Sequence, residues 1–586
     1  MTEKIDLRVQ YLAQGYESGR LRPAQVLEQV YENIERMGAE PVWIALRSFE
    51  ESLEALHEAA ERGPHGPLFG IPFAVKDNID VAGLPTTAAC PLFAYTPTVN
   101  ACVVQRLVQA GAIVIGKTNL DQFATGLTGT RSPYGVCASV FDPNYISGGS
   151  SSGSAIAVAR GDVSFSLGTD TAGSGRIPAA FNALVGLKPT RGLISTRGVV
   201  PACRTLDCVS IFAHTIGDVE RVLESCAGFD VDDPYAREAA VAEITVHEPP
   251  RFGVPQASQL EFFGDGESEA LYAQFVARLE RRGWKKSIID YAPFRRAAEL
   301  LYQGPWVAER FASIGEFMTR SPEAMHPIVR SVVAGARTYS ASDAFGAIYE
   351  LAALKRSIEP LWASIDTLLL PTAPTHYRID EVLADPIRLN QNLGTYTNFA
   401  NLLDLCALAT PAGFKRNGLP FGVTWFAPAF HDQSLREIAR QAAGENTPQS
   451  NLPPKGRVWL AVAGAHLSGQ PLNNELLSRR ARLVKTTTTS PQYRLFALGT
   501  TPPKPGLVHT REAVGRCIEV EVWEMDDAAF GNFVSQLPAP MTIGTTTLVD
   551  GSAVKGFTCE PFALEGAREI THFGGWRPYL ASSRRA

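Results

Sequence analysis

Short apolar runs separated by glycine-rich turns and helical stretches occupy residues 70–215, and this pattern limits the possible folds more than any other feature of the chain. Examples are IPFAV (71–75), AIVIG (112–116) and VSFSLG (163–168). Such runs are typical of strands buried in a sheet whose faces are covered by helices. We therefore expect an α/β core.

Later segments extend this core and then leave it. Residues 296–365 have a mostly helical pattern, whereas LLLPTAP (368–374) and LATPAGF (408–414) predict strands that return to the sheet. Far downstream, the segment IEVEV (518–522) alternates apolar and acidic residues, which predicts a half-buried strand. We expect that strand to belong to a second, strand-rich domain.

The stretch GENTPQSNLPPKG (444–456) is the best candidate for a linker. Its three prolines and its Gly, Asn and Ser residues oppose regular structure. We accordingly predict a large domain at 1–445, a linker at 446–457 and a smaller domain at 458–586.

Composition excludes several classes of protein. With 54 Lys and Arg against 60 Asp and Glu and 45% hydrophobic residues, the chain has the make-up of a folded protein. Its net charge of −6, without a long run of like charges, argues against binding of nucleic acid or of an acidic membrane.

The nine cysteines include no C-x-x-C pair, so neither a disulfide framework nor a metal site is indicated. No signal peptide and no run of ~18 apolar residues is present, so we expect a cytoplasmic protein without membrane spans.

Two pattern matches carry little weight. GAIVIGKT (111–118) satisfies the P-loop expression, but its centre is typical of a buried strand whose N–H groups are used by the sheet. Gly149-x-Ser151-x-Gly153 satisfies the nucleophile-elbow expression, yet a run of Ser and Gly produces that match by chance. The elbow stays open as a minor alternative.

The run SGGSSSGS (147–154) lies inside the predicted core, where a flexible linker is not expected. It leads directly into a helix-like segment, so its glycines allow unusual backbone angles at a junction between sheet and helix. The segment GTDTAGSGRIPAA (168–180) then places Ser174 between two glycines just before a predicted helix. Free N–H groups beside a serine hydroxyl are the parts of an oxyanion hole.

Four blocks together resemble the amidase signature family: LFGIPFAVKDNIDVAG (68–83), SGGSSSGSAIAVA (147–159), GTDTAGSGRIPAAF (168–181) and GLKPTRGLIS (186–195). The blocks occur in the order of that family, and with their connecting segments they cover most of residues 20–440. The resemblance implies an amidase signature fold, in which helices cover a central mixed β-sheet. It also implies a Ser-cisSer-Lys triad of Lys76, Ser150 and Ser174, with an oxyanion hole formed by the N–H groups of Thr171, Ala172, Gly173 and Ser174.

The residue types fit this chemistry. A serine hydroxyl needs a neighbouring base, and a lysine serves as one only when burial lowers its pKa. Lys76 follows the apolar run IPFAV (71–75), so we expect it at the end of a buried strand. The alternative for Lys76 alone is a snorkelling or ion-paired lysine beside Asp77. None of the ten histidines falls within the blocks, which disfavours a Ser-His-Asp triad.

The segment LLYQGPWVAERF (300–311) resembles allophanate hydrolases within the same family. That resemblance implies that Tyr302 and Arg310 hold the substrate carboxylate, with Gly126 as a further substrate-binding residue. A planar guanidinium and a phenol hydroxyl suit such an anion. The alternative is that Tyr302 and Arg310 lie on a surface, with a salt bridge to Glu309 nearby.

The C-terminal segments, among them VAGAHLSGQPLN (462–473), resemble the smaller domain of the same subfamily. The resemblance implies an α+β fold similar to that of γ-glutamyl cyclotransferases. His466 is a possible site there, because imidazole moves protons near neutral pH. A structural histidine is the alternative, and the domain itself serves either decarboxylation or assembly.

Taken as a whole, the resemblance implies hydrolysis of allophanate to ammonia and N-carboxycarbamate, leading on to carbon dioxide and ammonia in urea or s-triazine catabolism. No cofactor is expected. The implied partners are a second copy of the chain, bound through the amidase domain, and a urea carboxylase or biuret-forming enzyme. The competing interpretation is a component of a transamidation complex, to which the C-terminal domain and the pair of Tyr302 and Arg310 are foreign.

Overall fold

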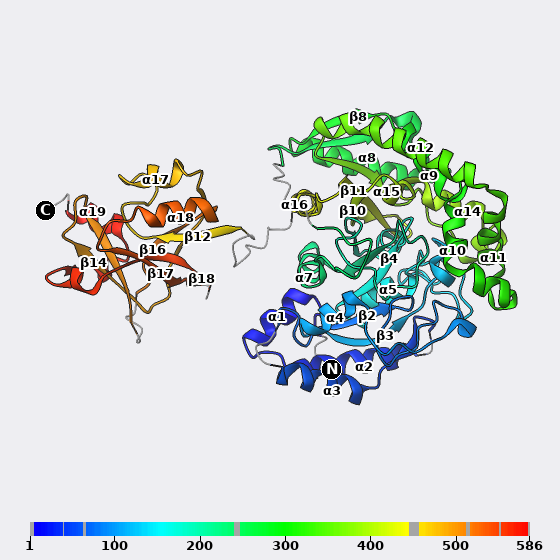
Figure 1. Ribbon diagram of the computed structural model, residues 1–586, viewed down its shortest axis with the longest axis horizontal. Helices are drawn as coiled ribbons and strands as arrows, with labels where there is room; N and C mark the ends of the chain where they lie inside the picture. Colours follow the sequence, from blue (N-terminus) through cyan, green and yellow to red (C-terminus); the bar gives the residue numbers. More distant parts are fainter. Residues whose placement is uncertain are drawn as a thin grey trace. The chain divides into compact units, whose positions relative to one another are not determined.

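The computed structural model of the chain describes residues 5–38, 40–62, 66–238, 246–444, 456–510, 516–549 and 552–583. The chain divides into two units, Met1–Thr447 and Pro448–Ala586, each with hydrophobic clusters of its own (Figure 1). Most of the predicted linker at 446–457 lies outside the described residues.

In the described part of the larger unit, eleven strands form one sheet. In order across the sheet they are β1 (Trp43–Leu46), β3 (Ile113–Thr118), β2 (Pro72–Lys76), β4 (Phe165–Asp170), β6 (Cys208–Ala213), β5 (Val185–Lys188), β10 (Leu405–Phe414), β11 (Pro420–Pro428), β9 (Thr367–Pro371), β7 (Arg251–Pro255) and β8 (Lys285–Ile289). Strand β2 is parallel to β3 and β4, and β7 is parallel to β8 and β9, whereas the other pairs are antiparallel. The sheet is therefore mixed, as predicted.

Both faces of this sheet are buried. Along β9, Leu369 packs in one hydrophobic cluster, whereas its neighbours Leu368 and Leu370 pack in another. In β11, Trp425 packs in the first of these clusters and its neighbour Phe426 packs in the second. Since successive side chains of a strand point to opposite faces, each face has its own apolar layer. This explains why the strands appear in the sequence as uninterrupted apolar runs.

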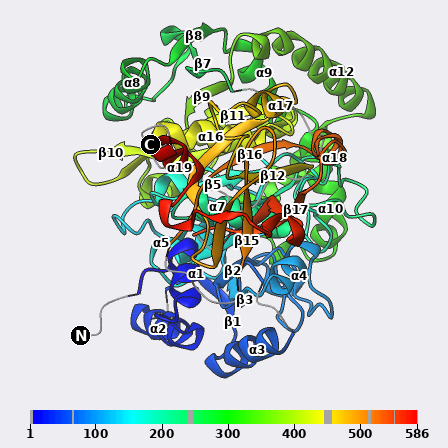
Figure 2. The ribbon, with the colours of Figure 1, turned by 90° about the vertical axis from the view of Figure 1, so that its left-hand side faces the viewer.

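Helices form the covering layers (Figures 1 and 2). They are α1 (Val9–Glu17), α2 (Pro23–Met37), α3 (Phe49–Glu61), α4 (Cys102–Gln109), α5 (Ser152–Ala159), α6 (Ile177–Phe181), α7 (Ile216–Cys226), α8 (Gly266–Arg281), α9 (Ala292–Tyr302), α10 (Trp306–Arg320), α11 (Pro327–Ala334), α12 (Ala341–Ile358), α13 (Ile379–Ala384), α14 (Arg388–Leu393), α15 (Phe399–Leu402) and α16 (Asp432–Ala443). Helices α9 to α12 gather on one side of the unit in Figure 1 and pack on one another. The predicted helical region at 296–365 is thereby confirmed.

The P-loop expression at 111–118 corresponds to strand β3, whose residues are all buried. Its residues pair with both β1 and β2. The backbone N–H groups are therefore used by the sheet, as the sequence predicted, and no phosphate-binding loop forms there.

The smaller unit contains, within its described residues, a five-stranded and a three-stranded sheet. The first has the order β13 (Arg482–Thr488), β16 (Glu519–Asp526), β12 (Arg457–Val462), β18 (Ala553–Cys559) and β17 (Met541–Thr547). The second consists of β15 (Lys504–His509), β14 (Tyr493–Leu498) and β19 (Arg568–Glu569). Helices α17 (Asn473–Leu477), α18 (Asp527–Ser535) and α19 (Trp576–Ser583) complete an α+β domain.

Strand β16 differs from its predicted half-buried pattern in one respect. Val520 and Val522 are fully buried as expected, but Glu521 between them is also buried, at 3% exposure. Its carboxylate accepts hydrogen bonds from the guanidinium of Arg577 in α19, at 2.6 Å, and from N–H of Ser468, at 2.7 Å. The second face of the strand is thus covered, and a cation from a distant helix compensates the buried charge.

Candidate active site

Lys76 is the last residue of β2, and its side chain is fully buried. Its Nζ donates hydrogen bonds to Oγ of Ser150, at 2.8 Å, and to Oγ1 of Thr169, at 2.7 Å. Burial lowers the pKa of Lys76 to about 7, although nearby carboxylates act in the opposite direction. The amine can therefore lose its proton near neutral pH, as a general base must.

Asp77 does not pair with Lys76. Its Oδ1 lies 3.1 Å from Nζ of Lys117, and both of these side chains are fully buried. Its Oδ2 accepts the N–H of Thr87 at 3.0 Å. The alternative of an ion-paired surface lysine at position 76 is therefore wrong, because the neighbouring acid already has another partner.

Ser150 belongs to the Ser/Gly run, which is a buried loop leading into α5 rather than a linker. The Gly149–Ser150 peptide bond is cis, as the resemblance implied. A Cβ atom on Gly149 would lie 2.2 Å from Oδ2 of Asp121, and one on Gly148 would lie 3.0 Å from Cα of Pro178. Glycine is required at both positions because other segments of the chain press against the loop backbone.

Ser151, the centre of the nucleophile-elbow pattern, is also fully buried. Its hydroxyl donates to the carbonyl oxygen of Thr169 at 3.1 Å and accepts the N–H of the same residue at 3.3 Å. This hydroxyl holds α5 against β4, so the geometry disfavours the elbow alternative.

Ser174 lies in the turn between β4 and α6, with 3% of its surface exposed. The carboxylate of Asp170 organises this turn, since it accepts the N–H groups of Gly173, at 2.9 Å, and Gly175, at 3.0 Å. The same carboxylate binds the guanidinium of Arg176 at 2.8 Å. A network of this kind, fully buried, gives the turn one defined shape.

The Asp170 contact corrects one expectation. The resemblance implies that Gly173 offers its N–H to an oxyanion, but that group already donates to Asp170. Within the described residues, no hydrogen bond is found for the N–H groups of Thr171, Ala172 and Ser174, which leaves these three as donors for a ligand. The side-chain carboxylate captures the N–H of Gly173 because it lies on the inside of the same turn.

The Ser174 turn and the Ser150 loop lie side by side. The amide Nδ2 of Asn182, at the end of α6, donates to the carbonyl oxygen of Ser147 at 2.9 Å. Close packing of Gly148 on Pro178 joins the same two segments. In the described part of the chain, Oγ of Ser174 makes no hydrogen bond, whereas Ser150 and Lys76 are already bonded to each other.

Arg310 of α10 is a buried cation, with 1% of its surface exposed. Its Nη2 donates to the hydroxyl of Tyr302 at 3.2 Å, and its Nη1 donates to Oγ1 of Thr125 at 3.0 Å. No carboxylate within ion-pair distance of Arg310 is found among the described residues, and its buried Nε has no partner there. A buried guanidinium without an acid is costly unless an anion binds to it.

Glu309 does not supply that acid. Its carboxylate accepts the N–H of Thr205 at 2.6 Å and the Thr205 hydroxyl at 2.8 Å. The alternative of a surface salt bridge between Arg310 and Glu309 is therefore wrong. Tyr302 and Arg310 do lie together, with the guanidinium 5.2 Å from the centre of the phenol ring.

Gly126 is buried beside this pair but has a packing role. A Cβ atom there would lie 2.5 Å from Oδ2 of Asp121. The structure thus explains the glycine by its close approach to a carboxylate, and a substrate contact of Gly126 stays a prediction.

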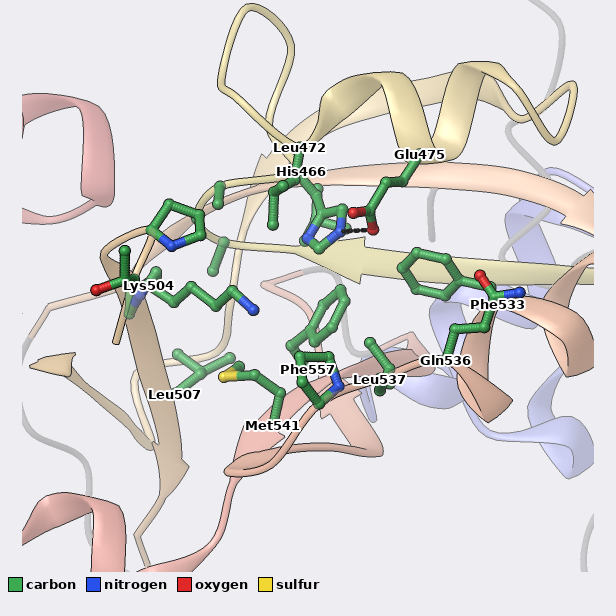
Figure 3. Close-up of a pocket in the computed structure, with 18 of the residues that line it drawn as sticks. His466, Leu472, Glu475, Lys504, Leu507, Phe533, Gln536, Leu537, Met541 and Phe557 are labelled. Carbon is green, nitrogen blue, oxygen red and sulfur yellow. Dashed lines mark hydrogen bonds and ion pairs between the residues drawn. The ribbon is translucent and has the colours of Figure 1, made fainter. Parts of the chain in front are cut away.

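The smaller unit contains a cavity of about 380 Å³ that His466 lines (Figure 3). The imidazole of His466 stacks on the ring of Phe557, with centroids 5.0 Å apart, and its Nε2 lies 3.1 Å from Oε2 of Glu475. Burial lowers the pKa of His466. Figure 3 shows the side chain of Lys504 extending from β15 into the same cavity.

Two family models match the chain. Residues 25–435 match a family model described as Amidase. The chain belongs to the amidase family. Residues 458–581 match a second model, described as the allophanate hydrolase C-terminal domain.

Relatives of this amidase match from about two thirds to nearly all of the chain. Urea amidolyase of Saccharomyces cerevisiae is 41% identical over 594 residues, which cover 95% of the chain but 32% of the relative. The chain therefore spans about a third of the length of that relative. A glutamyl-tRNA(Gln) amidotransferase component of Nostoc is 33% identical, and the match covers 64% of the chain and 83% of the relative.

Among solved structures, allophanate hydrolase of Kluyveromyces lactis is 40% identical, with a TM-score of 0.76. The match covers 99% of this amidase and 100% of the yeast chain. The predicted fold, an amidase sheet with a smaller C-terminal domain, is confirmed, and the chain is an amidohydrolase.

Sequence reasoning missed three residues of the amidase site. Thr169, a partner of Lys76, falls inside the GTDTAGSG block and could have been found there. Thr125, a partner of Arg310, is 185 residues away from it in the chain, and no local pattern marks that contact. Asp121, which packs against Gly149 and Gly126, is likewise outside the four blocks.

Two further features, a metal site and a membrane-spanning helix, are not found among the described residues. Over the described ranges, no group of three His, Cys, Asp or Glu side chains is placed to hold a metal ion. No helix in that part of the amidase is long and apolar enough to cross a membrane.

Proposed function

We propose that this amidase hydrolyses allophanate, a urea that bears a carboxylate. The observation that carries the proposal is the buried Arg310, which donates to two hydroxyls and a carbonyl oxygen and has no carboxylate within ion-pair distance among the described residues. A substrate carboxylate would supply the missing anion and accept donors from the guanidinium, while the Tyr302 hydroxyl adds a further donor. Fixing one end of the substrate in this way aims the terminal amide at the serine.

In the proposed mechanism, Ser174 Oγ attacks the carbonyl carbon of the terminal amide. Its proton passes through the hydroxyl of Ser150 to the neutral amine of Lys76, and the lysine later gives a proton to the departing ammonia. Water then attacks the acyl-enzyme with the same relay and releases N-carboxycarbamate. Lys76 and Ser150 already have the geometry for this transfer, at 2.8 Å.

The negative oxygen that forms during each attack needs donors. We assign this role to the N–H groups of Thr171, Ala172 and Ser174, which have no partner in the described part of the chain. The Asp170 network supports the assignment because it holds the turn in shape before the substrate arrives. Donors that are fixed in advance stabilise the transition state without reorganisation.

The similarity of both units to allophanate hydrolase of Kluyveromyces lactis supports this substrate. The competing function is that of a component of a transamidation complex, favoured by the 33% identity to the glutamyl-tRNA(Gln) amidotransferase relative. That relative matches 64% of the chain. We favour allophanate because the match to the transamidation relative covers 64% of the chain, whereas the match to the yeast allophanate hydrolase covers 99% of it.

One assay separates the two functions. The purified chain is supplied with allophanate or with glutamine, and released ammonia is measured. We expect ammonia from allophanate without any partner protein. Release of ammonia from glutamine but not from allophanate would overturn the proposal.

For the smaller domain, we propose decarboxylation of N-carboxycarbamate at the cavity lined by His466. Support comes from the partly buried imidazole beside Glu475, in a cavity that also contains the cation of Lys504. An ammonium attracts a carboxylate, and an imidazole can protonate the nitrogen that remains after carbon dioxide leaves. A role in assembly is the alternative.

The proposed setting is urea or s-triazine catabolism in the cytoplasm. The alignment with a third of a longer urea amidolyase supports association with a urea carboxylase, and a biuret-forming enzyme is the other candidate supplier of allophanate. We also propose a homodimer through the amidase domain, Gly126 as a substrate contact, and domain limits of 1–445 and 458–586 with a linker at 446–457.

A further inference from the structure

Asp121 is a fully buried acid that the proposed mechanism does not use. It follows β3, and its backbone N–H donates to the carbonyl oxygen of Ser150 at 3.0 Å. Its carboxylate accepts three further N–H groups, from Thr128 at 3.3 Å, Gly129 at 3.0 Å and Arg131 at 2.9 Å. One residue thus contacts both the cis-serine loop and the loop at 125–131.

Two glycines make room for this carboxylate. A Cβ atom on Gly149 would lie 2.2 Å from Oδ2 of Asp121, and one on Gly126 would lie 2.5 Å from the same oxygen. Gly149 precedes Ser150, and Gly126 follows Thr125, whose hydroxyl accepts a hydrogen bond from Arg310. The Asp121 carboxylate therefore packs between two segments. One contains Ser150, and the other contains Thr125, the partner of Arg310.

Among the described residues Asp121 forms no ion pair, and its hydrogen-bond donors are backbone N–H groups. The buried guanidinium of Arg131 is the cation near it: burial lowers the pKa of Arg131, and the Asp121 charge acts in the opposite direction. The Asp121 charge raises the pKa of Lys76, and it acts in the same direction on Arg131 and His326, while burial lowers the pKa of all three groups. Of the charged groups around Lys76, Asp121 has the largest effect in raising its pKa, Asp170 and Asp207 act in the same direction, and Arg310 acts against them.

The other groups that face Lys76 do not replace Asp121. Ser150 and Thr169 contact the amine through neutral hydroxyls. Lys117, on the adjacent strand β3, is already paired with Asp77. Burial alone would push the lysine far towards the neutral amine, and a nearby fixed negative charge is what opposes that effect.

We propose that Asp121 is a positioning residue that fixes the Ser150 loop and the loop at 125–131, which contains the Arg310 partner Thr125, relative to each other. The inference rests on the proposed role of Lys76. It predicts two separable effects, one on the protonation of the base and one on recognition of the substrate carboxylate.

The first effect is measured with a small neutral alkyl fluorophosphonate. The Ser174 oxygen forms a bond to phosphorus, the phosphorus–fluorine bond breaks, fluoride leaves, and the serine proton passes to Lys76. The second-order rate is followed from pH 5 to 9 for the full chain and for Asp121→Asn. Because an ammonium is less favourable without the carboxylate, we expect the midpoint of the rise to move down by about one pH unit.

The matched control is Asp162→Asn, which changes another buried acid, paired with Arg160 beyond the C-terminal end of α5. For this control, the second-order rate should rise with the same midpoint pH as for the full chain. An unmoved midpoint in folded Asp121→Asn would overturn the inference about Asp121. A full chain whose rate does not rise with pH would instead overturn the base role of Lys76, and the inference with it.

The second effect is measured with Asp121→Glu, which keeps the charge but is too long for its niche. We expect an unchanged midpoint with the fluorophosphonate and a KM for allophanate raised at least tenfold, while kinetics on a simple neutral amide change less. Asp121→Glu also tests the inference if Asp121→Asn does not fold. Wild-type KM for allophanate in Asp121→Glu would overturn the positioning role.

Discussion

At the scale of single residues, the proposed mechanism joins Ser174, Ser150 and Lys76 in one route for a proton. Lys76 and Ser150 are in contact, and Lys76 is held from its other side by Thr169. Groups that act as one unit lose most of their effect when any member is removed.

We therefore expect Ser174→Ala to lower kcat for allophanate by several orders of magnitude, with Ser150→Ala and Lys76→Ala nearly as severe. Ammonia release is the measurement, and circular dichroism should show that all three variants are folded. Ser151→Ala is the matched control. Loss of activity in Ser151→Ala together with an active Ser174→Ala would replace this mechanism by the nucleophile elbow.

Arg310 makes a second prediction at this scale. Its replacement by Ala should cost about 2–4 kcal/mol of transition-state stabilisation for allophanate, the range for truncating one partner of a buried charge pair. Arg310→Lys should recover part of the loss, since it keeps the charge but not the planar fork. The check is kcat/KM for allophanate and for an uncharged amide. An equal loss of kcat/KM on both substrates would show that Arg310 stabilises the fold rather than recognises the carboxylate.

The pH dependence follows from Lys76, whose pKa burial lowers to about 7. The reaction needs the neutral amine, so kcat/KM should rise with pH through about 7 and fall about tenfold per unit below it. Activity that is flat between pH 5 and 8, with a folded protein throughout, would contradict a lysine base.

At the scale of elements, two strands and two loops bring the site together. Strand β2 ends at Lys76, and β4, its parallel neighbour, contains Thr169 and leads into the Ser174 turn. The Ser150 loop then packs between the Asp121 segment and the start of α6. Precise placement of the loop depends on the absence of a side chain at Gly149.

Gly149→Ala should therefore lower both activity and thermal stability, because the added methyl has no space beside Asp121 and the N–H of Gly129. We expect Tm to fall by several degrees, as for about 1–3 kcal/mol of overpacking. The control is Gly346→Ala in α12, where an added Cβ meets no atom within 4 Å. That change should be neutral or stabilising by up to about 1 kcal/mol, as differential scanning calorimetry would show.

At the scale of the whole molecule, the proposed amidase residues all precede the predicted linker. Each unit also has hydrophobic clusters of its own. A chain that ends at Gly444 should thus still release the first ammonia from allophanate, with a rate within a few-fold of the full chain.

The same truncation tests the smaller domain. Isotope-labelled NMR should detect accumulation of N-carboxycarbamate with the truncated chain and with His466→Ala, but not with the full chain. Because the intermediate also decarboxylates without an enzyme, its level early in turnover is the relevant measurement. Identical traces in all three proteins would leave the domain with a role in assembly or stability.

The sequence by itself predicted several strands of the central sheet and the residues that we propose for the amidase site. IPFAV and AIVIG predict buried strands because apolar runs record burial on both faces, which is a local property. The blocks around Lys76, Ser150 and Ser174 are recognisable because each keeps its residues close together in the chain. Burial of Lys76 followed from the apolar run before it, and the structure confirms it.

The tertiary structure alone decided which groups are partners. Asp77 is adjacent to Lys76 in sequence yet pairs with Lys117, because the parallel pairing of β2 and β3 brings that lysine to it. Gly173 donates to Asp170 rather than staying free, and Arg310 meets Thr125 from 185 residues away. Hydrogen bonds and charges select partners by distance in space. That distance is set by how the sheet, its loops and its helices pack, and no short stretch of sequence contains it.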